Sequence, residues 1–180
     1  SIYGKTLGIV GLGRIGQAVA KRAVACGMRI IYHNRQRLDS TIEDACKATY
    51  VTFDELLAES DFISLHVPYH KESHHLMNDA AFQKMKKGAT LINTARGAVV
   101  DEKSLIKNLK NGTLWGAALD VFEKEPVISS ELFELDNVVL SPHIGTGTID
   151  GRLAMCECVS DNILHFAQQQ FDKLDWVNKF

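Results

Sequence analysis

The side chains best suited to catalysis stand in three short segments, residues 93–97, 120–126 and 141–145. Arg96 offers a permanently charged, forked donor that can hold a carboxylate and polarise a neighbouring carbonyl. His143 offers an imidazole, which can deliver a proton near neutral pH. Together these groups can assist the reduction of a 2-oxo acid, in which hydride reaches the carbonyl carbon and a proton reaches its oxygen.

A carboxylate in the second segment completes this set. Glu125 is predicted to accept a hydrogen bond from the far nitrogen of the His143 ring and so to fix the orientation of the ring. Each segment follows a predicted strand, and doubly wound sheets place their ligands at the carboxyl ends of strands. The sequence therefore predicts one active site that contains Arg96, Glu125 and His143.

A glycine-rich turn precedes these segments. Residues 11–16 read GLGRIG, which has the spacing GxGxxG between a predicted strand and a predicted helix. In such a turn Gly11 allows the tight bend, Gly13 lets the backbone approach a pyrophosphate, and Gly16 lets helix and strand pack closely. The amides of Arg14 and Ile15, and the Arg14 side chain, would then meet the phosphates. A strand-to-helix turn without a ligand is the alternative.

The residues after the second predicted strand indicate which dinucleotide would bind. An NAD site places an acid there to accept from the ribose 2′-hydroxyl, but residues 32–37 read YHNRQR and hold none. Asn34 can donate to a 2′-phosphate, and Arg35 or Arg37 can pair with it. We therefore expect NADPH, with NAD as the second choice. The alternative is that both arginines belong to a solvated loop.

Short apolar runs alternate with amphipathic stretches along the whole chain. Continuously apolar strands separated by helices indicate a parallel sheet that is covered on both faces. The predicted fold is α/β, a doubly wound parallel sheet of the Rossmann type. Strands are predicted over residues 6–10, 28–32, 50–51, 61–67, 89–93, 114–121 and 138–140, and helices over residues 14–26, 53–59, 79–86, 102–110 and 151–171.

The composition is that of an ordinary globular domain. The chain has 180 residues, of which 46% are hydrophobic and 23% charged, with a formal net charge of −2. We predict a dinucleotide-binding domain over residues 1–150 and a C-terminal helix and tail over residues 151–180. The charge gives no basic footprint for nucleic acid, and no apolar run is long enough to span a membrane. Four cysteines do not make a disulfide scaffold, so a reducing, cytoplasmic location is expected.

Four histidines lie close together in the sequence, at positions 66, 70, 74 and 75. No cysteine, aspartate or glutamate completes a convincing ligand set with them, so we expect no metal site. His66 stands in an apolar strand, where a hydrogen-bonded core histidine is the simpler interpretation.

Five stretches carry a resemblance that covers nearly the whole chain. They read GKTLGIVGLGRIG (4–16), DFISLHVP (61–68), LINTARGAVVDE (91–102), GAALDVFEKEP (116–126) and SPHIG (141–145). In type and order they resemble the nucleotide-binding domain of the D-isomer-specific 2-hydroxyacid dehydrogenases. The resemblance implies hydride transfer between a nicotinamide coenzyme and a 2-oxo or 2-hydroxy acid.

The resemblance also implies roles for single residues. It assigns catalysis to Arg96, His143 and Glu125, and it favours Glu125 over Glu123. Asn34-Arg35 is similar to the NADPH-using glyoxylate and hydroxypyruvate reductases, which makes glyoxylate or hydroxypyruvate the expected substrate. A homodimer is implied as well. The implied coenzyme contacts, besides those named above, are Val67 and Pro68 beside the adenosine, Thr94, Ala95 and Asp120 around the nicotinamide, and Gly145.

The chain departs from the family in one respect. Full-length members begin with a substrate domain, whereas this sequence starts at the coenzyme domain. We therefore expect it to bind coenzyme but to turn over poorly, because closure over the substrate would be lost. Four C-terminal side chains, which would lack their usual partner, are expected to be mobile or covered by a neighbouring chain: Phe166, Phe171, Trp176 and Val177.

Two other functions fit parts of the sequence. Transcriptional corepressors that sense a dinucleotide are built on the same scaffold and can keep the three catalytic residues, so a corepressor-like interaction protein is the alternative. An AdoMet-dependent methyltransferase would need an acid near position 34 and would leave Arg96, Glu125 and His143 without a role, so it is discarded.

Overall fold

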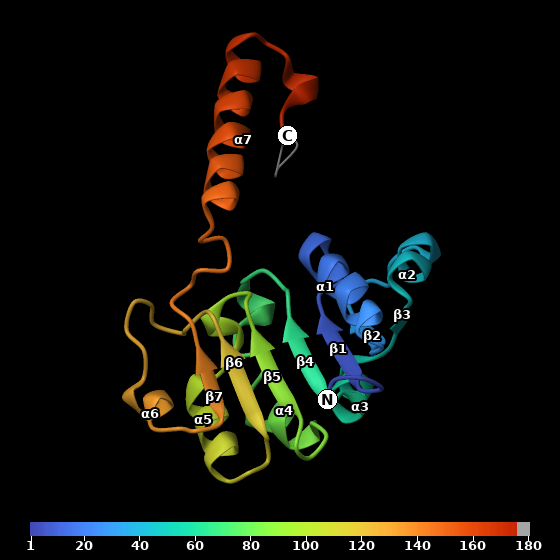
Figure 1. The fold of residues 1–180 in the computed structure, drawn as a ribbon, viewed down its shortest axis with the longest axis vertical. Helices are drawn as coiled ribbons and strands as arrows, with labels where there is room; N and C mark the ends of the chain where they lie inside the picture. The colour runs from blue at the N-terminus through green and yellow to red at the C-terminus, as the bar shows by residue number, and fades with distance from the viewer. Residues whose placement is uncertain (176–180) are drawn as a thin grey trace. The chain divides into compact units, whose positions relative to one another are not determined.

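The computed structural model describes residues 1–175 of the chain (Figure 1). It consists of two compact units, Ser1–His143 and Ile144–Phe180. Trp176 and Val177, two of the predicted tail residues, lie outside the described residues.

The first unit is built on a parallel sheet that, in the described part of the chain, has seven strands in the order β3-β2-β1-β4-β5-β6-β7. The chain runs outward from β1 to β3, then returns to the other side of β1 and continues outward to β7. This reversal between β1 and β4 is the switch point of a doubly wound sheet, and it confirms the predicted fold. The strands are β1 (Thr6–Val10), β2 (Arg29–His33), β3 (Ala48–Tyr50), β4 (Phe62–Leu65), β5 (Thr90–Asn93), β6 (Gly116–Leu119) and β7 (Val138–Leu140).

Helices cover the two faces of the sheet in two groups (Figure 1). Side chains of α1 (Arg14–Ala25) and α2 (Ser40–Cys46) pack with Leu7 and Ile9 of β1 in one apolar cluster. The second cluster contains Val10 of β1 and side chains from the opposite group of helices. Alternate residues of β1 thus serve opposite cores, as the pleat of a strand requires. The opposite group is α3 (Phe53–Glu59), α4 (Asp79–Lys84), α5 (Glu102–Lys110) and the short α6 (Ser130–Phe133).

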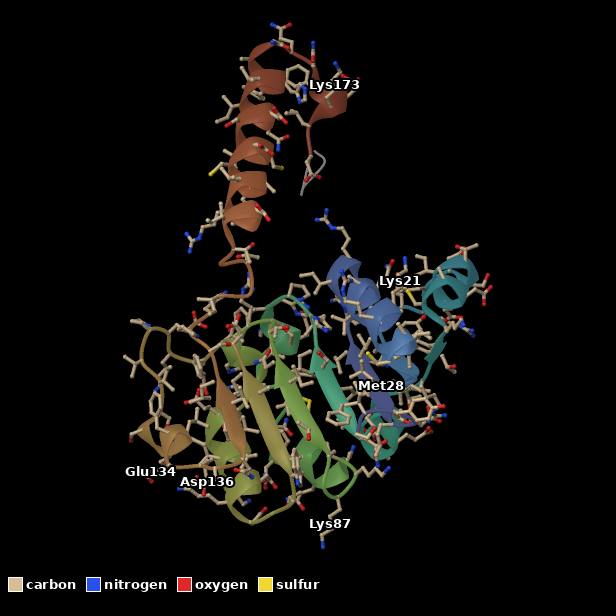
Figure 2. All side chains as sticks on the ribbon, viewed as in Figure 1. Lys21, Met28, Lys87, Glu134, Asp136 and Lys173 are labelled. Carbon is tan, nitrogen blue, oxygen red and sulfur yellow. The ribbon has the colours of Figure 1, made fainter. Side chains whose placement is uncertain are left out.

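Most predicted elements exist, and the differences lie at their ends. The predicted strand 114–121 is paired only over Gly116–Leu119, because pairing with β5 stops there. The helix α2 was not predicted. It begins after Asp39, whose carboxylate accepts from the amide of Thr41, so its start carries an ordinary N-cap signal. Lys87, in the turn after α4, points away from the sheet (Figure 2).

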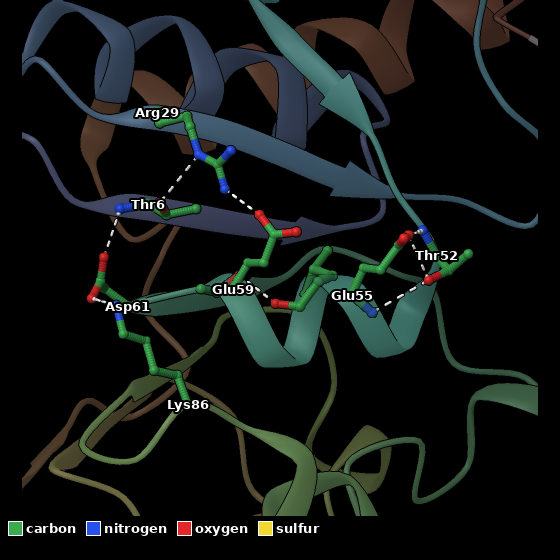
Figure 3. Close-up of polar contacts among 9 residues, drawn as sticks. Thr6, Arg29, Thr52, Glu55, Glu59, Asp61 and Lys86 are labelled. Carbon is green, nitrogen blue, oxygen red and sulfur yellow. Dashed lines mark hydrogen bonds and ion pairs between the residues drawn. The ribbon is translucent and has the colours of Figure 1, made fainter.

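Polar side chains fasten the sheet at the end opposite the predicted site (Figure 3). Asp61 accepts from the amide of Thr6 at 2.9 Å and from Nζ of Lys86 at 2.7 Å, which ties β1, β4 and the end of α4 together. Arg29 on β2 donates to Oγ1 of Thr6 at 3.3 Å and pairs with Glu59 of α3. These contacts hold β1 between its neighbours. They therefore fix the position of its carboxyl end relative to the ends of β2 and β4.

The second unit contains α7 (Ile149–Ala167), with Thr148 as the N-cap, and a short turn of 3₁₀-helix, η3 (Phe171–Lys173). The helix was predicted over residues 151–171, and it ends before that span does. Side chains project from α7 on all sides, and none of its residues is buried (Figure 2). Phe166 contacts Phe171 edge to face, with ring centroids 5.7 Å apart. Within residues 1–175, none of the helices combines the length and the apolar composition that a bilayer span requires.

Candidate active site

Two clefts open at the carboxyl ends of the strands. The first has a volume of about 820 Å³ and the second about 960 Å³. Both are lined by His66, Val67 and Pro68, the residues that follow β4, so this segment is their common wall. The clefts therefore meet beside the switch point, which is where open α/β sheets bind their ligands.

The glycine turn fits the approach of a pyrophosphate. Gly11 has φ +97°, and a Cβ there would lie 2.9 Å from the carbonyl carbon of His66. A Cβ on Gly16 would lie 2.4 Å from the carbonyl oxygen of Gly11, so that position allows only glycine without a shift of the backbone. A Cβ on Gly13, by contrast, would meet nothing within 4 Å. That open space borders the second cleft, which Gly11 and Gly13 line.

The first turn of α1 supplies amide donors at this point. Gly13 is the N-cap and makes no side-chain capping bond, so the first amides of the helix are not satisfied by a cap. Ile15 is 67% exposed and lines the first cleft. Arg14 is exposed but lines neither cleft. The backbone of the turn, more than the arginine side chain, is therefore arranged to receive an anion.

The loop after β2 brings only two of the three side chains that the sequence assigns to a 2′-phosphate to the second cleft. Asn34 and Arg35 line the second cleft, and Arg37 does not. The Oδ1 atom of Asn34 accepts from the amide of Leu12 at 2.8 Å, which leaves its Nδ2 hydrogens for a ligand. Arg37 donates twice to Glu43, from Nε at 2.9 Å and from Nη2 at 2.8 Å. The structure thus brings Asn34 and Arg35 to the cleft and holds Arg37 elsewhere.

Arg96 is an exposed side chain on the wall of the first cleft, together with Thr94 and Ala95. Asn93, the last residue of β5, shapes this turn by accepting from the amide of Ala95 at 3.0 Å and donating to the carbonyl oxygen of Arg96 at 3.1 Å. At the next residue, Gly97, a Cβ would lie 1.9 Å from the backbone of Phe122. The turn that carries Arg96 is therefore in backbone contact with the segment that leads to Glu125.

His143 and Glu125 face each other in the same cleft. Nδ1 of His143 lies 2.8 Å from Oε2 of Glu125, and Oε1 of Glu125 accepts from the amide of Phe122 at 3.0 Å. The bond from His143 is the main reason why the pKa of Glu125 lies below its ordinary value, and the bond from Phe122 adds to it. His143 has φ +54°, a conformation that L-residues rarely adopt and that recurs at functional sites.

Two assigned residues are not found on the wall of the first cleft. Asp120 is buried and accepts from Oγ of Ser141 at 2.6 Å, which joins the ends of β6 and β7. It is absent from the residues that line the first cleft. Gly145 belongs to the second unit.

One cleft residue, Glu123, makes contacts for which the sequence carries no clear signal. Glu123 lines the first cleft, 3.1 Å from Nε2 of His75, and it also accepts from the amide of Glu102 at 3.3 Å. His66 lies 2.9 Å from Oγ of Ser64, and burial lowers its pKa. The contacts of Glu123 with His75 and Glu102 join residues far apart in the chain, so spacing could not reveal them. The contact of His66 with Ser64 spans two residues and agrees with the hydrogen-bonded histidine that the sequence predicts. In residues 1–175, no three histidine, cysteine, aspartate or glutamate side chains converge as a metal site would require.

Comparison with known proteins shows the family of this chain. Residues 1–145 match the model of the D-isomer specific 2-hydroxyacid dehydrogenase, NAD binding domain. The chain belongs to this family. It is 56% identical to the glyoxylate reductase of Thermococcus litoralis over 178 residues, which are 99% of this chain and 53% of that protein. The chain thus spans about half the length of the curated relatives it matches.

Solved structures of dehydrogenases have the same fold. A glyoxylate reductase from Paecilomyes thermophila superposes with a TM-score of 0.88 at 44% identity, covering 91% of this chain and 49% of that one. D-lactate dehydrogenase from Aquifex aeolicus, solved with NAD and lactic acid, gives 0.86 at 35% identity, covering 98% and 58%. These relatives favour the dehydrogenase interpretation over the corepressor-like one.

Proposed function

We propose that this chain is the coenzyme-binding part of an NADPH-dependent reductase that converts a 2-oxo acid, glyoxylate or hydroxypyruvate, to the 2-hydroxy acid. The observation that carries the proposal is the His143–Glu125 pair in a cleft that Arg96 also lines. Reduction of a 2-oxo acid requires a proton donor held in one orientation, here His143, and a cation for the substrate carboxylate, here Arg96.

Each of the three side chains has one role in this reaction. The guanidinium of Arg96 binds the substrate carboxylate and polarises the carbonyl oxygen. Bound NADPH supplies the hydride that reaches the carbonyl carbon. His143 donates a proton to the carbonyl oxygen, so the product is the neutral hydroxyl, and the ring regains its proton from solvent. Glu125 accepts from Nδ1 of His143 and thereby leaves Nε2 as the donor toward substrate.

The preference for NADPH is supported by charge at the second cleft. Arg35 lines it, and Asn34 is oriented with its amide hydrogens available. A guanidinium attracts the 2′-phosphate of NADPH and has no matching partner on NADH. The glycine turn accepts the pyrophosphate that both dinucleotides share. In this proposal the nicotinamide occupies the first cleft, which Thr94 and Ala95 line.

Titration of this chain with NADPH and with NADH, at matched low ionic strength, tests the proposal. Coenzyme fluorescence gives both dissociation constants. Tighter binding of NADPH by about fivefold or more, worth roughly 1 kcal/mol, is expected. Equal or tighter binding of NADH would contradict the coenzyme assignment, and failure to bind either would contradict the function as a whole.

The family resemblance also supports a homodimer, which we include in the proposal. Light scattering on the purified chain measures its mass in solution. A mass near that of two chains is expected, and a monomer at micromolar concentration would contradict this part.

A further inference from the structure

A buried carboxylate lies beneath the loop that separates β2 from α2. Glu43 on α2 is 8% exposed and accepts hydrogen bonds from two side chains. Oη of Tyr32 donates to it at 2.7 Å, and Arg37 donates through the two nitrogens described above. Since a buried carboxylate is stable only when it is paired and hydrogen-bonded, Glu43 fixes both partners in place.

The network joins β2, the loop after it and α2. Tyr32 is the fully buried fourth residue of β2, and its Oη also accepts from the amide of Leu38 at 3.0 Å. The bonds from Arg37, and then from Tyr32, lower the pKa of Glu43 to about 2. Burial, and then the bond to Glu43, raises the pKa of Tyr32 to about 12. The carboxylate is therefore charged and the phenol protonated throughout the neutral range.

The same loop is held from a second side. Oη of Tyr50 on β3 donates to the carbonyl oxygen of Asn34 at 3.3 Å, and the Arg37 guanidinium lies 6.0 Å from the centre of the Tyr50 ring. With the bond from Leu12 to Asn34, the loop has fixed points at residues 34, 37 and 38. Arg35 is different, because it takes no part in these loop contacts and lines the second cleft, where Glu72 is its charged neighbour.

We propose that Arg37, Glu43 and Tyr32 are positioning residues that hold this loop in the shape that presents Asn34 and Arg35 to the adenosine ribose. Arg35 is then the arginine of this loop that pairs with a 2′-phosphate, and Arg37 is not. This inference rests on the proposed function, and it assigns Asn34 and Arg35 to the ligand and Arg37 to the support of the loop.

The two tasks predict different effects on the two dinucleotides. Only NADPH carries the phosphate that Arg35 would bind, so loss of Arg35 affects NADPH alone. The ribose and the glycine turn are common to both dinucleotides, and Asn34 bonds to that turn through Leu12. Loss of the support under Asn34 therefore weakens NADPH and NADH together.

A matched pair of substitutions on this chain tests the inference, Arg35→Gln and Arg37→Gln, with both dissociation constants measured by coenzyme fluorescence. Arg35→Gln is expected to weaken NADPH by about tenfold or more and NADH by less than about twofold. Arg37→Gln is expected to weaken both dinucleotides, NADH by roughly three- to tenfold and NADPH by at least as much, because the same loop presents Asn34 and Arg35.

Glu43→Gln provides the second arm, because it removes the charge and keeps the size of the side chain. It is expected to reproduce the parallel loss, and the double variant Arg37→Gln/Glu43→Gln should be no weaker than either single variant. If Arg37→Gln melts near room temperature, Arg37→Lys replaces it, since lysine keeps the charge but cannot make the paired contact.

Two results would overturn the inference. A loss confined to NADPH in Arg37→Gln would make Arg37 a phosphate ligand, and unchanged binding of both dinucleotides would show that the loop needs no such support. If the parent chain prefers NADH, the coenzyme proposal fails, yet a parallel loss in Arg37→Gln still supports the positioning role.

Discussion

At the scale of single residues, the contact between His143 and Glu125 carries the proposed chemistry. The carboxylate is held twice, by the ring of His143 and by the amide of Phe122, so it cannot turn away when the substrate arrives. The ring in turn has one nitrogen committed to Glu125. Proton donation then depends on a geometry that exists before binding, which is the condition for efficient general acid catalysis.

Substitution of Glu125 by glutamine tests this dependence. We expect kcat for the proposed reduction of glyoxylate to fall by about 10²-fold, because the imidazole loses its charged orienting partner. Binding of NADPH to this chain should change by less than about twofold, since Glu125 does not contact the glycine turn. Steady-state kinetics and coenzyme titration measure the two effects.

Glu131→Gln is the matched control, because Glu131 pairs with Lys110 on the surface. It should leave kcat within about twofold of the parent. An unchanged kcat in Glu125→Gln would remove Glu125 from the mechanism.

The sequence predicted the members of the first cleft better than it predicted the contacts of the loop after β2. Arg96, Glu125 and His143 could be grouped because each follows a strand, and carboxyl ends of parallel strands meet at one edge of a sheet. Arg37 could not be separated from Arg35 in the same way. Its partner Glu43 lies on α2, a helix that was not predicted, and only the fold brings them together.

At the scale of elements, the glycine turn separates packing from ligand binding. Gly16 and Gly13 belong to the same six-residue motif, but the space beside them differs. A methyl group on Gly16 meets the backbone of Gly11, whereas one on Gly13 meets nothing. Gly16 is needed by the fold, whereas Gly13, we infer, is needed only by the ligand.

Gly13→Ala and Gly16→Ala should therefore differ in kind. Gly13→Ala is expected to change the unfolding free energy by less than about 0.5 kcal/mol and to weaken both dinucleotides by about tenfold or more. Gly16→Ala is expected to destabilise the chain by about 1–3 kcal/mol through overpacking. Chemical denaturation and coenzyme titration check the pair, and unchanged coenzyme binding in Gly13→Ala would show that no phosphate approaches this turn.

Asp61 anchors the other end of β1, and its loss should affect stability without affecting the coenzyme. Its carboxylate accepts from Thr6 and Lys86, and the bond from Lys86 is the main cause that lowers its pKa. Asp61→Ala leaves the Thr6 amide without this partner and is expected to cost about 1–3 kcal/mol in unfolding free energy. Denaturant titration measures the loss, and a parent-like midpoint would contradict the role of this anchor.

Element types were easier to predict than element ends. The buried strand β1 and the helices α3 and α5 have the predicted bounds, since a strong apolar pattern and clear capping residues define them. The strand before Phe122 was predicted too long, because apolar residues continue past the last paired residue, Leu119. Pairing depends on the neighbouring strand, which a local pattern does not contain.

At the scale of the whole molecule, the Tyr32–Glu43 pair predicts how stability depends on pH. The pKa of Glu43 falls from 4.5 to about 2 on folding, so its contribution is complete above pH 4.5 and is lost as the pH falls toward 2. The pKa of Tyr32 rises from 10.0 to about 12, so its contribution is complete below pH 10.0 and is lost as the pH rises toward 12.

Denaturant unfolding over a pH series measures the fall in unfolding free energy at the acid end and at the alkaline end of the range, which we call the acid limb and the alkaline limb. Glu43→Gln should flatten the acid limb between about pH 4.5 and 2, and Tyr32→Phe should flatten the alkaline limb. Parent-like slopes in both variants would show that the pair does not titrate with folding.

The length of the chain also bears on its activity. It spans about half of its curated relatives, and the proposed site lies in open clefts of the first unit. We expect this chain to turn over glyoxylate at least about 10²-fold more slowly than a full-length relative, because positioning and exclusion of water both contribute to rate. Parallel assays at saturating NADPH test this, and equal rates would contradict it.

The edges of the sheet have a consequence for how such chains can associate. Its outermost strands in the described residues, β3 and β7, are each three residues long, and Pro142 follows two residues after β7 ends. Edges this short offer too few open amides and carbonyls to template a strand from another molecule. Copies of the chain are thereby protected from edge-to-edge aggregation, and any pairing of subunits must use helices or loops instead of extending the sheet.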